Sequence, residues 1–464
     1  MGIMRIFSSG DTWITDERPG DSNSLTLRAS GSDHGRSPAL NVFAKKDEIV
    51  SGSVELARSL IRFDLSELSG MVFTDLTIPS GSATYNLKMF NQEHEDTVPS
   101  SYDLFVFPVS RSWDEGLGID DDNHSDEGYA SWLNATSTAA WDVTGSDYVS
   151  GSTGLLSASQ HFDAGTEDFE VDITPVVNEW LSGTTVSNNG LVVKLGSVEE
   201  TGSVNYYRKS FHSRESLFVD KLPYIEVRWD DVTKDNRSNF AYGQSNSLYL
   251  YNFVRGALTD LTEPITVTIR DNAIDASASY NQDFAASKIS TGIYGITSTI
   301  ENTASFSASW NDVWTSGSVV YMTGSFSPVS LTGSSSDINE QYVIAPRGLK
   351  RVYREAEEAR ISVNVRKRDF VTHRGIVATA SLDPETEQIE TMYYSVINNE
   401  TGEVVIPFGT GSVPYTQLSY DANGNFFDLK MRTFVPGFKY EIIFLLDINN
   451  DQQVISDEFT FKVV

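Results

Sequence analysis

Acidic side chains form the densest cluster of metal-binding groups in this sequence. Seven carboxylates and no Lys or Arg lie between residues 114 and 127, in a stretch that includes Asp120, Asp121 and Asp122. Carboxylate oxygens at this density are ligands for Ca²⁺. The ligand spacing and the glycine turn of an EF-hand loop are both missing here. We therefore expect a solvated acidic loop, with Ca²⁺ binding as the alternative.

A second calcium-loop pattern lies near the end of the sequence. Residues with side-chain oxygens occupy positions 1, 3, 5 and 12 of the template, namely Asp447, Asn449, Asp451 and Glu458. Gln452 replaces the glycine that the template requires, and Ile455 occupies a ligand position. Because Asn and Asp tolerate left-handed backbone conformations, we expect an ordinary hairpin turn, with metal binding as the alternative.

Basic side chains gather in one stretch of an otherwise acidic chain. Residues 347–374 contain nine basic and four acidic residues. One interpretation is a solvated strand face and loop. The other is a docking surface for an acidic neighbour, because complementary fields speed and orient association. The candidate docking residues are Lys350, Arg351, Arg354, Arg360, Arg366, Lys367 and Arg368.

Signatures of the common enzyme classes are missing from the sequence. It contains no Gly-x-Ser-x-Gly elbow, no His-Glu-x-x-His helix and no phosphate-binding Gly-x-x-x-x-Gly-Lys loop. The six histidines are scattered singly, at His34, His94, His124, His161, His212 and His373. We expect no catalytic residues, no cofactor and no enzymatic activity. Polysaccharide cleavage by paired carboxylates is the enzymatic alternative, since 64 acidic residues guarantee chance pairs.

Composition narrows the classes of partner. The chain has 34 basic and 64 acidic residues, a formal charge of −30, which repels polyphosphate and makes us expect no nucleic-acid binding. It has no Cys, so disulfides and thiolate metal sites are excluded, as suits synthesis in a reducing cytoplasm. No stretch approaches the ~20 consecutive apolar residues that span a bilayer, so we expect no membrane insertion.

Charge also divides the chain into three parts. Residues 1–232 hold 16 basic and 37 acidic residues, residues 233–345 hold 5 and 10, and residues 346–464 hold 13 and 17. Turn-forming residues at 230–239 mark the first break, and a small polar loop at 331–337, or Pro346 just beyond it, marks the second. With roughly 150 residues per domain, we expect three domains, over residues 1–232, 240–345 and 346–464.

Alternating apolar and polar residues predict strands along most of the chain. Segments 104–109, 265–269 and 361–365 show this period of two, and turn residues separate them, which is typical of β-sandwiches. One convincing helix is predicted over 172–183, where Thr174 can cap the first turn, Pro175 suits the first helical position and Gly183 supplies a stop. Residues 353–360 lack an apolar stripe, so we expect a polar connection there.

Six motifs in residues 1–232 resemble, in their order, those of a known domain family. They are SGDTWI (9–14), RSLIRFDLS (58–66), SWDE (112–115), FEVDIT (169–174), NGLVV (189–193) and FHSRE (211–215). In this order they resemble the DNRLRE family of jelly-roll domains, which is related to a group of carbohydrate-binding modules. The acidic loop at 120–127 departs from the family pattern. The resemblance implies a jelly-roll β-sandwich and a link to glycan binding.

Two charged features within these motifs also have a physical interpretation. Strand alternation places Ile61, Phe63 and Leu65 on the core face of segment 60–65. Arg62 and Asp64 then lie on the opposite face, at the surface or rim. Arg214 and Glu215 are expected to lock a sheet edge through a guanidinium-carboxylate contact, in a structural role, with a glycan site as the alternative.

Six further motifs, in residues 346–464, resemble those of a second kind of domain. They are LKRVYR (349–354), ISVNVR (361–366), MYYSVI (392–397), VIPF (405–408), LSYD (418–421) and NFFDL (425–429). They resemble immunoglobulin-like domains of tailed-phage virion proteins, especially those of large, T4-like marine phages. The middle part predicts a further sandwich, with Trp310 and Trp314 as core residues. The expected fold is all-β: an N-terminal jelly-roll sandwich with one short helix, followed by two immunoglobulin-like sandwiches.

These expectations lead to a functional hypothesis. The chain is expected to be a non-enzymatic structural protein of a tailed-phage virion, located at the neck, a capsid vertex or a tail appendage. Its expected partners are other virion structural proteins and further copies of itself, in a homo-oligomer or in multiple copies per particle. The alternative is a glycan-binding adhesin module that contacts the host surface.

Overall fold

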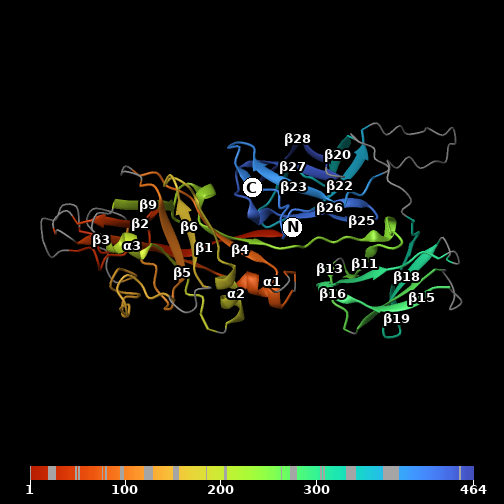
Figure 1. Ribbon diagram of the computed structural model, residues 1–464, viewed down its shortest axis with the longest axis horizontal. Coiled ribbons are helices and arrows are strands. Elements are labelled where there is room, and N and C mark those ends of the chain that lie inside the picture. Colours follow the sequence, from red (N-terminus) through yellow and green to blue (C-terminus); the bar gives the residue numbers. More distant parts are fainter. Residues whose placement is uncertain are drawn as a thin grey trace. The chain divides into compact units, whose positions relative to one another are not determined.

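The structure is a computed structural model of the chain (Figure 1). It describes residues 2–464 except 19–27, 48–49, 51–52, 76, 79–80, 95–98, 120–128, 150–155, 184, 203–205, 256, 263, 272–278, 304–305, 307–308, 331–340, 369–385 and 449–450. The acidic loop at 120–127 and the polar loop at 331–337 therefore lie outside the described residues, whereas Pro346, the alternative position of the second break, lies in β20 (Tyr342–Arg347). Two compact units emerge. The N-terminal unit comprises residues 4–69 and 83–228, and the C-terminal unit comprises residues 1–3, 70–82 and 229–464.

Strands make up almost all the regular structure, which confirms the predicted all-β class built from sandwiches. In the N-terminal unit the hydrogen-bonded order is β6-β5-β8-β3-β1-β10-β4-β7, and β2 joins β3 to β9. The strands are β1 (Ile3–Thr15), β2 (Ala39–Lys46), β3 (Val54–Phe63), β4 (Thr84–Met89), β5 (Tyr102–Pro108), β6 (Ala158–Phe162), β7 (Phe169–Asp172), β8 (Leu191–Leu195), β9 (Tyr206–His212) and β10 (Tyr224–Arg228).

Strand β3 is buried on both faces. Ile61, Phe63 and Leu65 lie in the core, as the alternation predicts, but Leu60 on the opposite face is also fully buried. The reason is a cluster of tryptophans that covers that face from the irregular segment after β5, made of Trp113, Trp132 and Trp141. Aromatic side chains of this size bury a large apolar area, so a long loop supplies a second layer of core.

The predicted helix exists as α2 (Thr174–Ser182), with Val176, Val177 and Trp180 buried. Gly183 ends it at φ 65°, a left-handed conformation that glycine adopts without strain. The predicted Thr174 cap is wrong: the carboxylate of Asp172 accepts from the Thr174 amide at 2.8 Å. The Thr174 hydroxyl accepts instead from the amide of Tyr85 in β4. Two shorter helices that the sequence did not reveal are α1 (Ser66–Phe73) and α3 (Ser197–Thr201).

The C-terminal unit begins with a sandwich of two sheets, ordered β11-β17-β16 and β15-β14-β18-β19, beside a two-stranded ribbon β12-β13. Its core contains Trp310 and Trp314, both fully buried as predicted. The elements are η2 (Asn236–Ser238), β11 (Ser245–Tyr251), β12 (Phe253–Val254), β13 (Ala257–Leu258), β14 (Ile265–Arg270), β15 (Asn281–Ala285), β16 (Ser287–Ser290), β17 (Ile293–Thr299), β18 (Trp310–Ser316) and β19 (Val319–Phe326).

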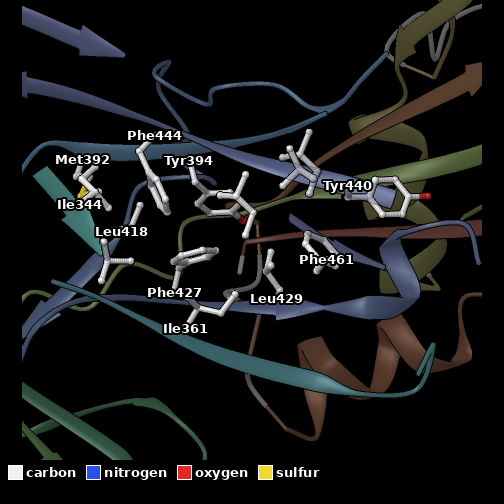
Figure 2. Close-up of a cluster of buried hydrophobic side chains, with 14 of the residues drawn as sticks. Ile344, Ile361, Met392, Tyr394, Leu418, Phe427, Leu429, Tyr440, Phe444 and Phe461 are labelled. Atoms are coloured by element: carbon white, nitrogen blue, oxygen red, sulfur yellow. The ribbon is translucent and has the colours of Figure 1, made fainter. Parts of the chain in front are cut away.

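A second sandwich follows, with sheets ordered β20-β22-β26-β25 and β21-β28-β27-β23-β24. Figure 2 shows its core, in which the rings of Tyr394 and Phe427 stack at 4.5 Å. The strands are β20 (Tyr342–Arg347), β21 (Val352–Tyr353), β22 (Glu358–Lys367), β23 (Met392–Asn398), β24 (Val404–Ile406), β25 (Ser419–Asp421), β26 (Gly424–Lys430), β27 (Lys439–Ile448) and β28 (Asp451–Val463). The predicted polar connection over 353–360 is only partly correct: residues 354–357 form a turn without helix, but Tyr353 is buried in β21 and residues 358–360 begin β22. Within the described part of the chain, no helix is long and apolar enough to cross a membrane.

Candidate functional site

Three loops of the N-terminal unit meet in one place, which we call the loop cluster: residues 33–38, 114–119 and 213–219. The Asp33 carboxylate accepts from the amide of Leu117 at 2.9 Å, and the Arg36 amide donates to the carbonyl of Gly118 at 2.7 Å. The Ser213 hydroxyl donates to the carbonyl of Ser37 at 2.6 Å. Each loop is thus held by backbone groups of another, which fixes their relative positions.

Ion pairs reinforce the loop cluster. The Arg214 guanidinium contacts Glu215 at 3.2 Å, the contact expected from the sequence. It also donates from Nε to Glu115 at 2.6 Å, and Arg36 contacts Glu215 at 3.1 Å. Glu115 and Arg36 are far from Arg214 in sequence, so spacing alone could not reveal these two pairs. The arrangement joins all three loops through charged hydrogen bonds, which are stronger than neutral ones.

A buried carboxylate lies beneath this network. Asp11 in β1 is 1% exposed, and it accepts from the Arg214 amide at 2.9 Å and from the Ser8 hydroxyl at 3.1 Å. Its own amide donates to Glu115 at 2.9 Å. Burial raises the pKa of Asp11 to about 7, and the nearby Glu115 charge adds to this, although the hydrogen bonds from Arg214 and Ser8 oppose it. Asp11 therefore carries a proton for part of the time near neutral pH.

Large apolar side chains stand exposed on the loop cluster, and we call them the apolar rim: Leu117, Ile119, Leu217, Phe218 and Val219. Leu217 is 94% exposed, Phe218 61% and Leu117 60%. The Phe218 ring packs edge-on against His212 at 5.3 Å, and its amide donates to the Ser216 hydroxyl. Exposed apolar groups gathered in this way are typical of surfaces that contact another molecule.

Arg62 and Asp64, expected at the surface or at the rim of the sheet, have separate roles. Arg62 donates to the carbonyl of Trp113 at 3.0 Å and lies over its ring at 5.0 Å. Asp64 is exposed and accepts from the amide of Ser66 at the start of α1. Arg62 thus helps to attach the tryptophan-bearing loop to β3, and Asp64 satisfies an amide at a helix end.

The seven candidate docking residues fall into two groups in the second sandwich of the C-terminal unit. Lys350, Arg351 and Arg354 lie in the connection that precedes β22, and the others lie on β22 or directly after it. Three contact carboxylates: Lys350 with Glu357 at 3.0 Å, Arg360 with Asp428 at 2.8 Å and Lys367 with Glu387 at 3.9 Å. Arg368 donates to the Gln341 side chain at 2.7 Å.

Strand alternation explains which of these residues face solvent. Ile361, Val363 and Val365 point into the core, so Arg360 and Arg366 on the same strand point outward and are exposed. Burial alone would raise the pKa of Asp428, but the hydrogen bond from Arg360 opposes burial, and the pKa of Asp428 is lowered. Arg351 and Arg354 are exposed as well. Arg351, Arg354, Arg360 and Arg366 thus make the seven docking candidates, which we call the basic strip, accessible to solvent. The docking role of the basic strip stays a prediction.

The second calcium-loop pattern is divided by the fold. Asp447 lies at the end of β27, opposite Gln452 of β28, and Glu458 lies farther along β28. Asn449 lies outside the described residues. Among the residues that the structure describes, no group of three or more His, Cys, Asp or Glu side chains is placed to hold a metal ion.

Comparisons with known proteins identify no family. No family model and no curated protein matches the chain. Solved structures with some likeness include the adhesin InvE of Yersinia pseudotuberculosis (10% identity, TM-score 0.17), the Ig1-2 module of the Drosophila receptor tyrosine phosphatase DLAR (12%, 0.17) and the amphioxus IgVJ-C2 molecule (9%, 0.12). They cover 49%, 50% and 47% of this chain, and this chain covers 56%, 94% and 97% of them. At such TM-scores the likenesses carry no argument.

Proposed function

We propose that this chain is a non-enzymatic structural component of a tailed-phage virion, at the neck, a capsid vertex or a tail appendage, and that it acts by packing against neighbouring subunits. The observation that carries the packing role is the apolar rim, held in place by the ion pairs of the loop cluster. The virion setting rests on the resemblance of residues 346–464 to immunoglobulin-like domains of phage virion proteins. The neighbours we propose are other virion proteins or further copies of the chain.

The loop cluster has the properties of a preorganised contact surface. Binding costs conformational entropy when loops must become ordered, and loops that are already fixed avoid much of this cost. Arg36, Arg214 and Glu215 fix the loops here, while Leu217 and Phe218 present apolar area to solvent. Protein interfaces combine apolar and charged residues, and the loop cluster offers both.

The first test is mass spectrometry of purified virus particles, in which we expect peptides of this chain at a fixed stoichiometry. The second test replaces the rim residues Leu217 and Phe218 by Ser and measures incorporation of the variant into particles. We expect incorporation to fall by at least tenfold, because an anchor side chain in an interface contributes roughly 2 kcal/mol or more.

A matched control exists in the same unit. Val198 in α3 is 75% exposed and lies outside the loop cluster, so Val198→Ser removes a comparable exposed apolar group. We expect this variant to enter particles at the wild-type level. Intact particles that lack the chain would overturn the virion assignment, and equal incorporation of the rim variant and the control would overturn the role of the rim.

A glycan-binding adhesin is the second candidate function, and one observation favours it. Phe218 is an exposed aromatic ring in the unit that resembles carbohydrate-binding jelly rolls. Aromatic faces bind sugars through their apolar surface. A glycan array probed with the full chain tests this candidate: signal that Phe218→Ser abolishes would support it, and no binding across host-surface polysaccharides would reject it.

A further inference from the structure

Lys209 occupies an unusual position in the N-terminal unit. It lies on β9 and is 1% exposed, and its ammonium nitrogen is 2.6 Å from the side-chain oxygen Oδ1 of Asn91. The same nitrogen donates to the carbonyls of Gly165 and Glu167 at 2.9 and 2.7 Å. The backbone of Asn91 pairs with that of Phe211, so the two side chains come from adjacent extended segments.

Aromatic rings and two carboxyl groups surround this pair. Lys209 Nζ lies 4.9 Å from the ring centre of Phe162 and 5.3 Å from that of Phe211, which limits the access of water. The Asp168 carboxylate accepts from the backbone N–H of Asn91 at 2.8 Å. The Glu167 carboxylate accepts from the Ala164 amide through Oε1, while its Oε2 is buried without a hydrogen-bond partner among the described residues.

Burial also changes the protonation of the amine. Desolvation lowers the pKa of Lys209 to about 8, and the charges of Glu167 and Asp168 oppose part of this effect. A lysine with its ordinary pKa of 10.5 is almost never neutral at pH 7. With a pKa of about 8, Lys209 is neutral roughly 10% of the time at pH 7, and a neutral amine is a nucleophile.

We propose that Lys209 and Asn91 are the partners of an intramolecular isopeptide bond that forms in the folded chain. The neutral Nζ attacks the side-chain carbonyl carbon of Asn91, so the Nζ–Cγ bond forms and the Cγ–Nδ2 bond breaks. A carboxylate of Glu167 or Asp168 takes the proton from Nζ and delivers it to Nδ2, which leaves as ammonia. The step needs no oxidant, reductant or other co-reactant.

The fold makes this step efficient because it fixes both reactants. Groups held within van der Waals contact in a water-poor site react as if at very high concentration. Lys194 offers a comparison, since it is also a buried lysine of the same unit. Its Nζ donates to the carbonyl of Leu195 at 2.8 Å and contacts Glu200 at 3.0 Å. Unlike Lys209, Lys194 thus contacts a carboxylate and no asparagine side chain in these two interactions.

The decisive measurement is the intact mass of the full chain after purification and denaturation. We expect a mass below that calculated from the sequence by one ammonia, about 17 Da. Tryptic digestion should then yield one branched peptide that joins Asn91 to Lys209. A folded wild-type chain with the full calculated mass would overturn the proposal. So would a succinimide at Asn91, which also loses ammonia but leaves the Lys209 peptide separate.

Variants locate the bond and its proton carrier. Lys209→Arg should show the full mass calculated for its own sequence, whereas the control Lys194→Arg should still show the loss. Glu167→Gln and Asp168→Asn together should slow the loss at least tenfold, and a variant pair that loses ammonia at the wild-type rate would overturn the proton route. Because the wild-type mass decides the main question, failure of a variant to fold does not affect that result.

Discussion

At the scale of single residues, Asp11 makes the stability of the N-terminal unit depend on pH. Its pKa is raised from the ordinary value of 3.8 to about 7, so the folded chain binds this proton more tightly than the unfolded chain does. The contribution of Asp11 to stability is therefore complete below about pH 4 and is lost as the pH rises to about 7. The loss reaches at most about 1.4 kcal/mol per pH unit in this range.

Asp11→Asn tests this dependence. We expect the free energy of unfolding of the variant to fall less steeply than that of the wild type between about pH 4 and 7, as measured by urea denaturation at several pH values. Asp163→Asn is the control, because the Asp163 side chain is 94% exposed, and it should reproduce the wild-type slope. Identical slopes for the Asp11 variant and the wild type would contradict the buried, protonated state of Asp11.

At the scale of elements, one arginine fastens the segment that precedes β11. Arg237 in η2 contacts Asp312 of β18 at 2.7 Å, and Asp312 is fully buried and also accepts from the indole of Trp314 at 2.6 Å. The segment also bonds to β25, where the Asp235 amide donates to the carbonyl of Tyr420. Removal of Arg237 would leave the Asp312 charge buried without its ionic partner, which is strongly destabilising.

We expect Arg237→Met to lower the free energy of unfolding of the C-terminal unit by about 3–5 kcal/mol. Arg360→Met is the matched control, because its pair with Asp428 is about half exposed, and it should change stability by less than about 1 kcal/mol. Urea denaturation followed by circular dichroism measures both variants, because both sandwiches of the C-terminal unit are built from strands. Equal losses for the two arginines would show that burial of Asp312 has no energetic consequence.

The elements also show what a single sequence reveals. Alternation identified β14 and β22, and Pro175 with Gly183 identified the helix α2, because these signals are local. The burial of Leu60 depends on tryptophans that lie at least 53 residues away in sequence, at Trp113 and beyond, and no local pattern reports such a contact. The pairs of Arg214 with Glu115 and of Lys209 with Asn91 are hidden for the same reason. Sequence therefore predicts strands well and long-range polar contacts poorly.

At the scale of the whole molecule, net charge distinguishes the two surfaces through which copies of the chain could associate, the apolar rim and the basic strip. The formal charge of −30 makes two copies repel each other at long range. Contact through the apolar rim gains nothing from charge. Salt screens the repulsion between two copies, so added salt should strengthen this contact. Contact between the basic strip and acidic residues of another copy is attractive at short range, so the same screening should weaken it.

We therefore expect the sign of the salt dependence to identify the surface. From about 0.05 M to about 0.5 M NaCl, the repulsion between charges more than about 10 Å apart becomes almost fully screened. If the apolar rim mediates self-association, sedimentation equilibrium should show stronger association at about 0.5 M NaCl than at about 0.05 M. In that case Leu217→Ser abolishes association at high salt, and Arg366→Glu leaves it unchanged. Association that decreases with salt, and that Arg366→Glu weakens while Leu217→Ser does not, would assign contact between copies to the basic strip instead.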